Sequence, residues 1–232
     1  MAYGVNLVYS GSWNITAERV PSGAVRWMGG INDFDFSWLL EPGESFQTPE
    51  VVLAWSDEGY SGLSRQFHDL YREALIPERF AKKPRPVVIN NWEGTRFLFT
   101  SEKLKAMISR AAGTGIDTFV LDDGWFGKRD DETSGLGDWF VNQKKLCGSL
   151  KNIIDHTHAC GMRFALWFEP EMVNRDSDLY RAHPEWVIRT PDEDPVEGRT
   201  QLVLDLTRQE VRDYIVEVVN KVIRGHAIDY VK

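Results

Sequence analysis

The sequence has few cysteines, no long apolar run and no excess of positive charge. Its two cysteines, Cys147 and Cys160, cannot form a disulfide framework and are typical of a reducing compartment. No run approaches the roughly 20 apolar residues that a membrane span needs, and the first residues lack the basic start and apolar stretch of a secretory signal. We therefore expect a cytoplasmic protein with no membrane partner.

Charge and missing motifs exclude several further classes. The chain carries 27 Lys and Arg against 35 Asp and Glu, and this net charge of −8 argues against nucleic acid as a partner. The glycine-rich dinucleotide motif, the P-loop and the G-x-S-x-G serine motif are missing from the sequence. His156 and Cys160 would share a helix face, but no further cysteine lies near them at zinc-site spacing. We expect no metal and no cofactor.

Residues 1–80 have the pattern of the end of an all-β domain followed by a connecting helix. Alternating runs at residues 5–9 and 25–27 and a more apolar run at 51–55 predict short strands separated by Gly and Pro turns. Apolar residues at helical spacing predict an amphipathic helix over 61–75, and prolines then mark a linker. The β region is too small for a complete sandwich, so we interpret it as the C-terminal remnant of a β-sandwich domain.

From residue 81 onward, strand and helix patterns alternate. Continuous apolar runs predict buried strands at residues 87–89, 118–121, 164–168 and 228–232, with helical stripes between them. Serial βα units imply a parallel sheet and an α/β fold. A closed (β/α)₈ TIM barrel needs about 250 residues, so residues 81–232 are expected to hold its first half.

Start and stop signals predict the helix ends. Ser101 is the predicted N-cap of the first helix, and Thr207 with Glu210 matches the capping box that would begin the last one. Gly225 would end that last helix. Residues 202–206 are either a short barrel strand or an extended entry to the capped helix.

Acids and tryptophans follow the apolar runs of this second region. Asp122 and Asp123 follow the second run, and nine Trp in 232 residues is a high number. Because the carboxyl ends of parallel strands meet at one edge of a sheet, we expect these side chains to gather at a single rim. Acids and flat rings together suit a neutral polyhydroxylated ligand, which means a sugar.

The aspartate pair has three interpretations. The two carboxylates could be helix-cap or loop acids, or they could accept hydrogen bonds from vicinal sugar hydroxyls, which the nearby Trp125 favours. They could also share a proton as an acid/base dyad. Adjacent residues at one strand end are poorly placed to act on opposite sides of a bond, so the dyad ranks below hydroxyl binding.

Further charged residues stand at strand ends or in loops. Of Glu169 and Glu171, one points into the barrel mouth or both are surface acids after the strand. Arg199 is either a solvated loop charge or a substrate contact. Lys232 is either only the end of the chain or a cation that binds sugar oxygens or lowers the pKa of a neighbouring carboxylate.

Long motifs in both regions point to one family. Residues 121–129 (LDDGWFGKR), 167–173 (WFEPEMV) and 178–184 (DLYRAHP) resemble glycoside hydrolase family 36, the bacterial-type α-galactosidases or melibiases. Residues 33–38 (DFDFSW) and 40–46 (LEPGESF) resemble the end of that family's N-terminal β-domain. The resemblance covers essentially the whole chain. It implies a retaining α-galactosidase that acts on melibiose- or raffinose-type sugars as a homo-oligomer.

The resemblance also implies substrate-binding roles for six residues: Asp122, Asp123, Trp167, Arg199, Lys232 and Trp92. The two aspartates would hold the galactose 4- and 6-hydroxyls, and Lys232 would bind galactose hydroxyls. Trp167 would line the galactose subsite, Trp92 would lie near the leaving group, and Arg199 would contact substrate near the nucleophile.

The two catalytic carboxylates of the family have no counterpart in this sequence. The family strand that matches residues 229–232 (DYVK) continues with Trp-Asp, that Asp is the nucleophile, and the acid/base Asp follows on a later strand. We therefore expect a C-terminally truncated chain, with both groups beyond Lys232, that is inactive alone. The alternatives are a related α-glycosidase with another sugar preference and a non-catalytic sugar-binding or incomplete fragment.

Overall fold

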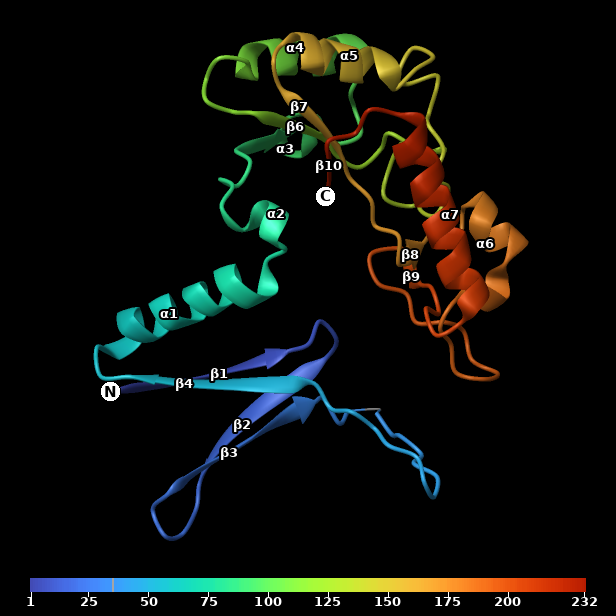
Figure 1. Ribbon diagram of the computed structural model, residues 1–232. Helices are drawn as coiled ribbons and strands as arrows, with labels where there is room; N and C mark the ends of the chain where they lie inside the picture. Colours follow the sequence, from blue (N-terminus) through green and yellow to red (C-terminus); the bar gives the residue numbers. More distant parts are fainter. Residues whose placement is uncertain (35) are drawn as a thin grey trace. The chain divides into compact units, whose positions relative to one another are not determined.

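The computed structural model describes residues 1–34 and 36–232 (Figure 1). Asp35, within the 33–38 motif, lies outside the described residues. The chain divides into two compact units, Met1–Pro84 and Arg85–Lys232. None of the described helices is long and apolar enough to cross a membrane.

The first unit contains two antiparallel strand pairs. β1 (Ala2–Val8) pairs with β4 (Glu50–Ser56), and β2 (Trp13–Arg19) pairs with β3 (Val25–Ile31). The pattern of the sequence had indicated β1, β3 and β4 but not β2. All but one of the β2 side chains are exposed, so its sequence lacks the buried face that makes a strand recognisable.

Helix α1 (Gly59–Leu70) follows β4 and continues through one π-helical turn, Tyr71–Leu75. A Cβ at Gly4 would lie 2.7 Å from the Phe67 ring and 2.9 Å from Leu63, so β1 can approach the apolar face of α1 only because it carries glycine there. A short helix, α2 (Glu78–Ala81), lies in the predicted linker.

The second unit is built on a four-stranded parallel sheet. Its strands are β5 (Val88–Asn90), β6 (Thr118–Leu121), β7 (Arg163–Leu166) and β10 (Tyr230–Val231), in the order β10-β7-β6-β5. Every neighbouring pair is parallel. This sheet confirms the predicted α/β fold.

Helices connect the strands and cover the sheet. α4 (Ser101–Ala111) links β5 to β6, α5 (Lys151–Ala159) links β6 to β7, and α7 (Gln209–Gly225) precedes β10. α4 and α5 lie side by side, and α5 packs against β7 (Figure 1). Apolar side chains at helical spacing from both helices enter one buried cluster with side chains of the sheet: Leu104, Ile108, Ile153, Ile154, Phe119, Leu121, Phe164 and Leu166.

A smaller subassembly lies between β7 and α7 in the chain. β8 (Met172–Val173) and β9 (Leu202–Val203) pair antiparallel, and α6 (Asp178–Ala182) leads into a 3₁₀ turn at Pro184–Trp186. These elements share a second apolar cluster with the start of α7. The ambiguous residues 202–206 therefore include a short strand, but it belongs to this ribbon and not to the parallel sheet.

Two predicted helix caps were wrong. The side chain that caps α4 is Thr100, whose Oγ1 accepts the Lys103 N–H at 3.4 Å, so Ser101 is the first helical residue. At α7 the Thr207 hydroxyl donates to Asp205 at 2.6 Å, and no side chain caps the helix. A carboxylate two residues upstream competes successfully for the hydroxyl that the capping box would have used.

The register of β10 is fixed at its amino end. Tyr230 lies opposite Ala165, and the Asp229 carboxylate accepts the Phe164 N–H at 2.8 Å. The Asp229 N–H in turn donates to the Phe164 carbonyl at 2.9 Å. His158 Nε2 also lies 2.8 Å from the same carboxylate oxygen.

Candidate functional site

Five of the predicted substrate-binding residues stand at the carboxyl ends of the four parallel strands. Trp92 follows β5, the aspartate pair follows β6, Trp167 follows β7, and Lys232 follows β10. Parallel strands place these ends along one edge of the sheet, as expected. We call this edge, with residues 197–201, the rim.

Asp122 joins two of these strand ends. Its Oδ2 accepts a hydrogen bond from Lys232 Nζ at 2.6 Å, and its carboxylate is buried while the lysine side chain is 46% exposed. Its backbone N–H donates to Asn91 Oδ1 at 2.8 Å. The second carboxylate oxygen accepts the Asp123 N–H at 3.0 Å. Lys232 and the Asp123 N–H therefore hold the carboxylate, and Asn91 holds the backbone of Asp122, although 110 residues separate Asp122 from the lysine.

Asp123 has a different partner. Arg129 binds its carboxylate in a bidentate manner, with Nε at 3.0 Å from Oδ1 and Nη2 at 2.9 Å from Oδ2. Both side chains are buried. Gly124, with φ +99°, makes the turn that lets the next residues fold back beneath the pair. Each carboxylate thus pairs with its own cation, which favours two separate acceptors over a proton-sharing dyad.

The two tryptophans after these strands have different roles. Trp125 is fully buried, its Nε1 donates to the Trp167 carbonyl at 2.9 Å, and its ring packs in the aromatic core. In the sequence, Trp125 favoured a sugar site beside the aspartate pair. That inference was wrong, because the Trp125 ring belongs to the core. Trp167 is half-buried, with its ring stacked at 6.3 Å on Phe126 and 6.1 Å from Trp139. The core fixes the ring and leaves part of it accessible.

Trp92 is connected to the Asp123 pair through one aromatic ring. Its indole meets Phe97 edge-on at 5.1 Å, and the Arg129 guanidinium lies over the Phe97 ring at 5.4 Å from the centroid. Trp92 is half-buried at the start of the short helix α3 (Trp92–Thr95). The contacts therefore place Trp92 next to the rim.

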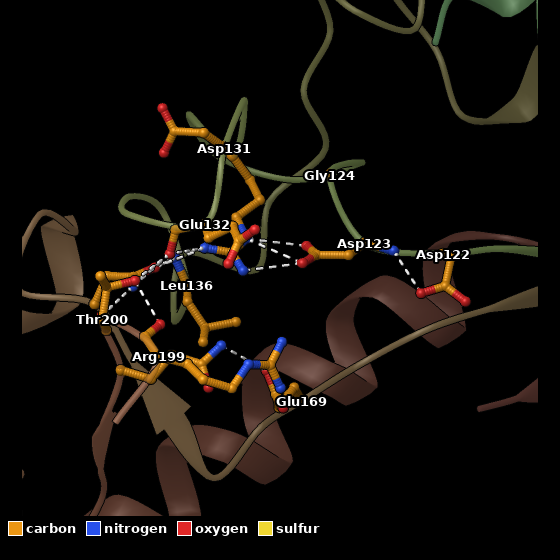
Figure 2. Close-up of polar contacts among 12 residues, drawn as sticks. Asp122, Asp123, Gly124, Asp131, Glu132, Leu136, Glu169, Arg199 and Thr200 are labelled. Atoms are coloured by element: carbon orange, nitrogen blue, oxygen red, sulfur yellow. Dashed lines mark hydrogen bonds and ion pairs between the residues drawn. The ribbon is translucent and has the colours of Figure 1, made fainter. Parts of the chain in front are cut away.

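Arg199 and Glu169 face each other across the rim (Figure 2). Burial, with a smaller contribution from the Glu171 charge, raises the pKa of Glu169 above its ordinary 4.5, and the Arg199 guanidinium opposes the shift. Glu169 also accepts a hydrogen bond from Gln201 at 3.2 Å, whereas Glu171 is exposed. Of the two glutamates after β7, Glu169 is therefore the one that faces the rim.

The sequence prediction overlooked two rim residues, Arg129 and Asn174. Both are buried polar residues, and buried polar residues are uncommon enough to draw attention. The sequence alone does not show this burial. Among the described residues, His, Cys, Asp and Glu form no group of three that could hold a metal ion. His156, considered for metal binding, lies 2.9 Å from Ser109 Oγ and 3.8 Å from Cys160 Sγ.

A parallel α/β sheet whose carboxyl edge carries buried acids, cations and tryptophans is the arrangement of a barrel enzyme with its active-site face. Comparison with known proteins identifies the family. Residues 45–232 match the Melibiase family, and residues 1–41 match the glycosyl hydrolase family 36 N-terminal domain. The chain belongs to the family 36 melibiases.

Several α-galactosidases are similar over the whole chain. AgaA of Geobacillus stearothermophilus is 49% identical over 230 residues, which cover 99% of this chain and 32% of AgaA. Mel36A of Lactobacillus acidophilus is 46% identical over 231 residues, again 32% of its length. A crystal structure of an AgaA variant in complex with raffinose superposes with a TM-score of 0.93 at 48% identity, covering 99% of this chain and 32% of that one. The chain thus spans about a third of the length of these relatives.

Proposed function

We propose that residues 1–232 form the galactose-binding part of a retaining α-galactosidase that hydrolyses melibiose- or raffinose-type sugars. The observation that carries the proposal is the pair of buried carboxylates, Asp122 and Asp123, each held by its own cation at the carboxyl edge of a family 36 sheet. Relatives that cover the whole chain are named α-galactosidases, and structures of AgaA variants hold raffinose and stachyose.

The geometry suits hydroxyl recognition. A carboxylate that already accepts one charged donor keeps further lone pairs for sugar hydroxyls, and such charge-assisted bonds are stronger than neutral ones. In the proposal, Asp122 and Asp123 accept the galactose 4- and 6-hydroxyls, and the half-exposed Lys232 donates to sugar oxygens beside them. The partly accessible ring of Trp167 would cover an apolar face of the sugar.

Two more residues complete the proposed subsite. The exposed side chain of Arg199 would contact substrate beside the nucleophile, and Trp92, next to the Asp123 pair through Phe97, would lie on the leaving-group side.

Hydrolysis with retention needs two carboxyl groups about 5–5.5 Å apart, one that attacks and one that protonates the leaving oxygen. The two aspartates are engaged by Lys232 and Arg129 as acceptors, and a placement error of about 1 Å already costs about 10²-fold in rate. Because the family resemblance implies that both catalytic carboxylates follow the position of Lys232, we assign them to that part of the full-length protein. Residues 1–232 alone are then expected to be inactive.

The test compares the full-length protein with a chain of residues 1–232 on p-nitrophenyl α-galactoside. Full-length protein should release nitrophenol and the shorter chain should not exceed a no-enzyme blank. Turnover by residues 1–232 would refute the assignment of the catalytic groups. Preference of the full-length protein for the α-N-acetylgalactosaminide over the galactoside would instead favour a related glycosidase, and galactose-dependent tryptophan quenching without any turnover would favour a binding protein.

Assembly and location belong to the same proposal. We expect the full-length enzyme to be a homo-oligomer, because the family resemblance implies one, and to reside in the cytoplasm, because its two cysteines here are free thiols. Sedimentation velocity of the full-length protein tests the first expectation, and cell fractionation tests the second.

A further inference from the structure

Three buried side chains, Asp123, Arg129 and Asn174, form one hydrogen-bonded unit at the rim, which we call the Arg129 cluster. Asp123 follows β6, Arg129 lies in the loop after it, and Asn174 follows β8. The cluster links the proposed sugar-binding carboxylate to the turn that carries Arg199. Neither Arg129 nor Asn174 is among the residues to which a substrate contact has been assigned.

Arg129 uses its whole guanidinium within the protein. Nε and Nη2 bind Asp123, and Nη1 donates to Asn174 Oδ1 at 2.9 Å and to the carbonyl groups of Glu132 and Ser134, both at 3.0 Å. The side chain is only 2% exposed. A planar guanidinium held at both ends fixes the plane and direction of the carboxylate it binds, which a lysine cannot do.

Asn174 uses every hydrogen-bonding group of its side chain. Its Oδ1 accepts from Arg129 and from the Leu136 N–H at 2.9 Å, and its Nδ2 donates to the Glu132 carbonyl at 3.2 Å and to the Thr200 carbonyl at 2.6 Å. Two donors on one side and two carbonyls on the other allow only one orientation of the amide. The amide therefore connects Arg129 directly to the 198–201 turn.

That turn needs outside support. Arg199 and Thr200 both have left-handed backbones, with φ +54° and φ +61°, a conformation that residues with side chains rarely adopt. Two backbone hydrogen bonds between Gly198 and Gln201 close the turn. Support from outside it comes from Asn174 and from the Thr200 hydroxyl, which donates to the Glu132 carbonyl at 2.8 Å. Figure 2 shows Thr200 and Glu132 together on the side of the cluster opposite Asp122.

We propose that Arg129 and Asn174 are positioning residues, which hold Asp123 and the Arg199 turn at a fixed separation and thereby set both the affinity for the sugar and the turnover rate. The inference rests on the proposed function, because separation matters only if Asp123 and Arg199 bind one sugar. It assigns no sugar contact to either positioning residue. Their effect passes through Asp123 and Arg199 alone.

The experiment measures KM and kcat of full-length variants on p-nitrophenyl α-galactoside and on its 4-deoxy and 6-deoxy analogues. Arg129→Lys keeps the charge and loses the bidentate geometry; we expect kcat to fall about 10²-fold, the cost of a misplacement near 1 Å. It should also lower the ratio of kcat/KM for the galactoside to kcat/KM for the deoxy analogue that lacks the hydroxyl bound by Asp123. Asn174→Asp keeps the acceptor for Arg129 and removes the donor to Thr200, so kcat should fall while that ratio persists.

The control is a buried aspartate outside the cluster. Asp138 accepts the N–H groups of Asp178 and Leu179, both at 3.0 Å, so Asp138→Asn should lower thermal stability and leave KM, kcat and the ratio of the two kcat/KM values within about twofold. If Arg129→Lys and Asn174→Asp, assayed well below their melting temperatures, change only what Asp138→Asn changes, the positioning role is refuted.

Two variants of one exposed residue, Thr200, keep the inference testable if the variants of the buried residues do not fold. Thr200→Ala removes the exposed hydroxyl that braces the turn, and Thr200→Ser keeps it. We expect kcat to fall in the first and recover in the second; equal values in both would count against the inference. Wild-type protein that does not hydrolyse the galactoside at all would refute the proposed function instead, so the two failures are distinguishable.

Discussion

The two units use their apolar side chains in different ways. Both apolar clusters of buried residues found in the described chain lie in Arg85–Lys232, where side chains from the sheet and from the helices α4, α5, α6 and α7 are fully or nearly fully buried. In Met1–Pro84, only Ala2, Leu7 and Leu63 are buried among the described apolar residues. Large apolar side chains of that unit are instead exposed: Tyr3, Trp13, Val25, Trp27, Met28, Leu53 and Trp55.

The β1–β4 pair shows the cause of this difference. Gly4 lies on the face that receives α1, and the neighbouring pair Tyr3 and Trp55 lies on the other face, 64% and 56% exposed. The sequence therefore provides apolar residues for both faces of the β1–β4 pair, and within the unit α1 covers only one of these faces. Burial of apolar surface is the main stabilising contribution to a fold, so we expect the stability of the chain to reside mainly in residues 85–232.

The same truncation in a strand of each unit should show the largest difference. Leu166 in β7 is fully buried and Leu53 in β4 is 72% exposed. Leu166→Ala should lower the free energy of unfolding by about 2–5 kcal/mol, whereas Leu53→Ala should change it by about 0.5 kcal/mol or less. Urea titration of both variants measures this. Similar losses would show that the two units are equally dependent on their apolar residues.

Helix caps offer a second comparison. Thr100→Ala removes the side chain that caps α4 in the second unit and should lower the free energy of unfolding by about 1 kcal/mol. Glu58 occupies the N-cap of α1 without a capping hydrogen bond and pairs with Arg65 on the surface. Glu58→Ala should therefore have an effect of about 0.5 kcal/mol or less. A larger loss at Glu58 than at Thr100 would contradict the comparison.

The raised pKa of Glu169 predicts a pH dependence confined to the second unit. The folded protein holds this proton more tightly than the unfolded chain, so the free energy of unfolding should fall as the pH rises from about 4.5 through the folded pKa. Glu169→Gln should remove that fall and be more stable than wild type at pH 7 but not at pH 4. Glu50→Gln, on an exposed strand of the first unit, is the control for lost charge. If the difference in free energy of unfolding between Glu169→Gln and wild type does not increase with pH, the raised pKa of Glu169 is refuted.

The exposed face of the first unit should affect association more than stability. Leu53→Lys replaces an exposed apolar side chain with a charge and should change the free energy of unfolding by about 0.5 kcal/mol or less. It should also reduce self-association of residues 1–232 in sedimentation velocity, because exposed apolar patches promote contact between molecules. Gln47→Lys adds the same charge at an exposed polar position. An equal reduction by both would show that charge, and not the apolar face, controls association.

Periodicity in the sequence predicted the parallel strands and the longer helices of the second unit. The stripe that predicted the first helix, which includes Leu104 and Ile108, is the buried face of α4, and the apolar runs predicted the parallel strands. Such patterns work where one face or both faces are buried. They did not reveal β2, where almost every side chain is exposed.

The remaining differences arise from contacts between distant residues. Arg129 and Asn174 are 45 residues apart, and nothing local marks either as part of a cluster. The capping box at Thr207 is a local pattern that lost to a nearer local contact with Asp205. Five of the six predicted site residues stand at strand ends of the parallel sheet, where topology determines their place, and Arg199 lies in the turn before β9. Their individual roles remain predictions.

The hydrogen bonds between Asp229 and Phe164 at the amino end of β10 have a consequence at the other end of the strand. Asp229 binds Phe164 through both its side chain and its backbone, which sets the alignment of β10 against β7. Successive side chains of a strand alternate between faces, so sliding β10 by one position would turn the ammonium group of Lys232 away from Asp122. Asp229, three positions upstream, therefore helps to determine on which side of the sheet the Lys232 cation lies, together with the backbone hydrogen bonds of Lys232 to Leu166 and Phe168.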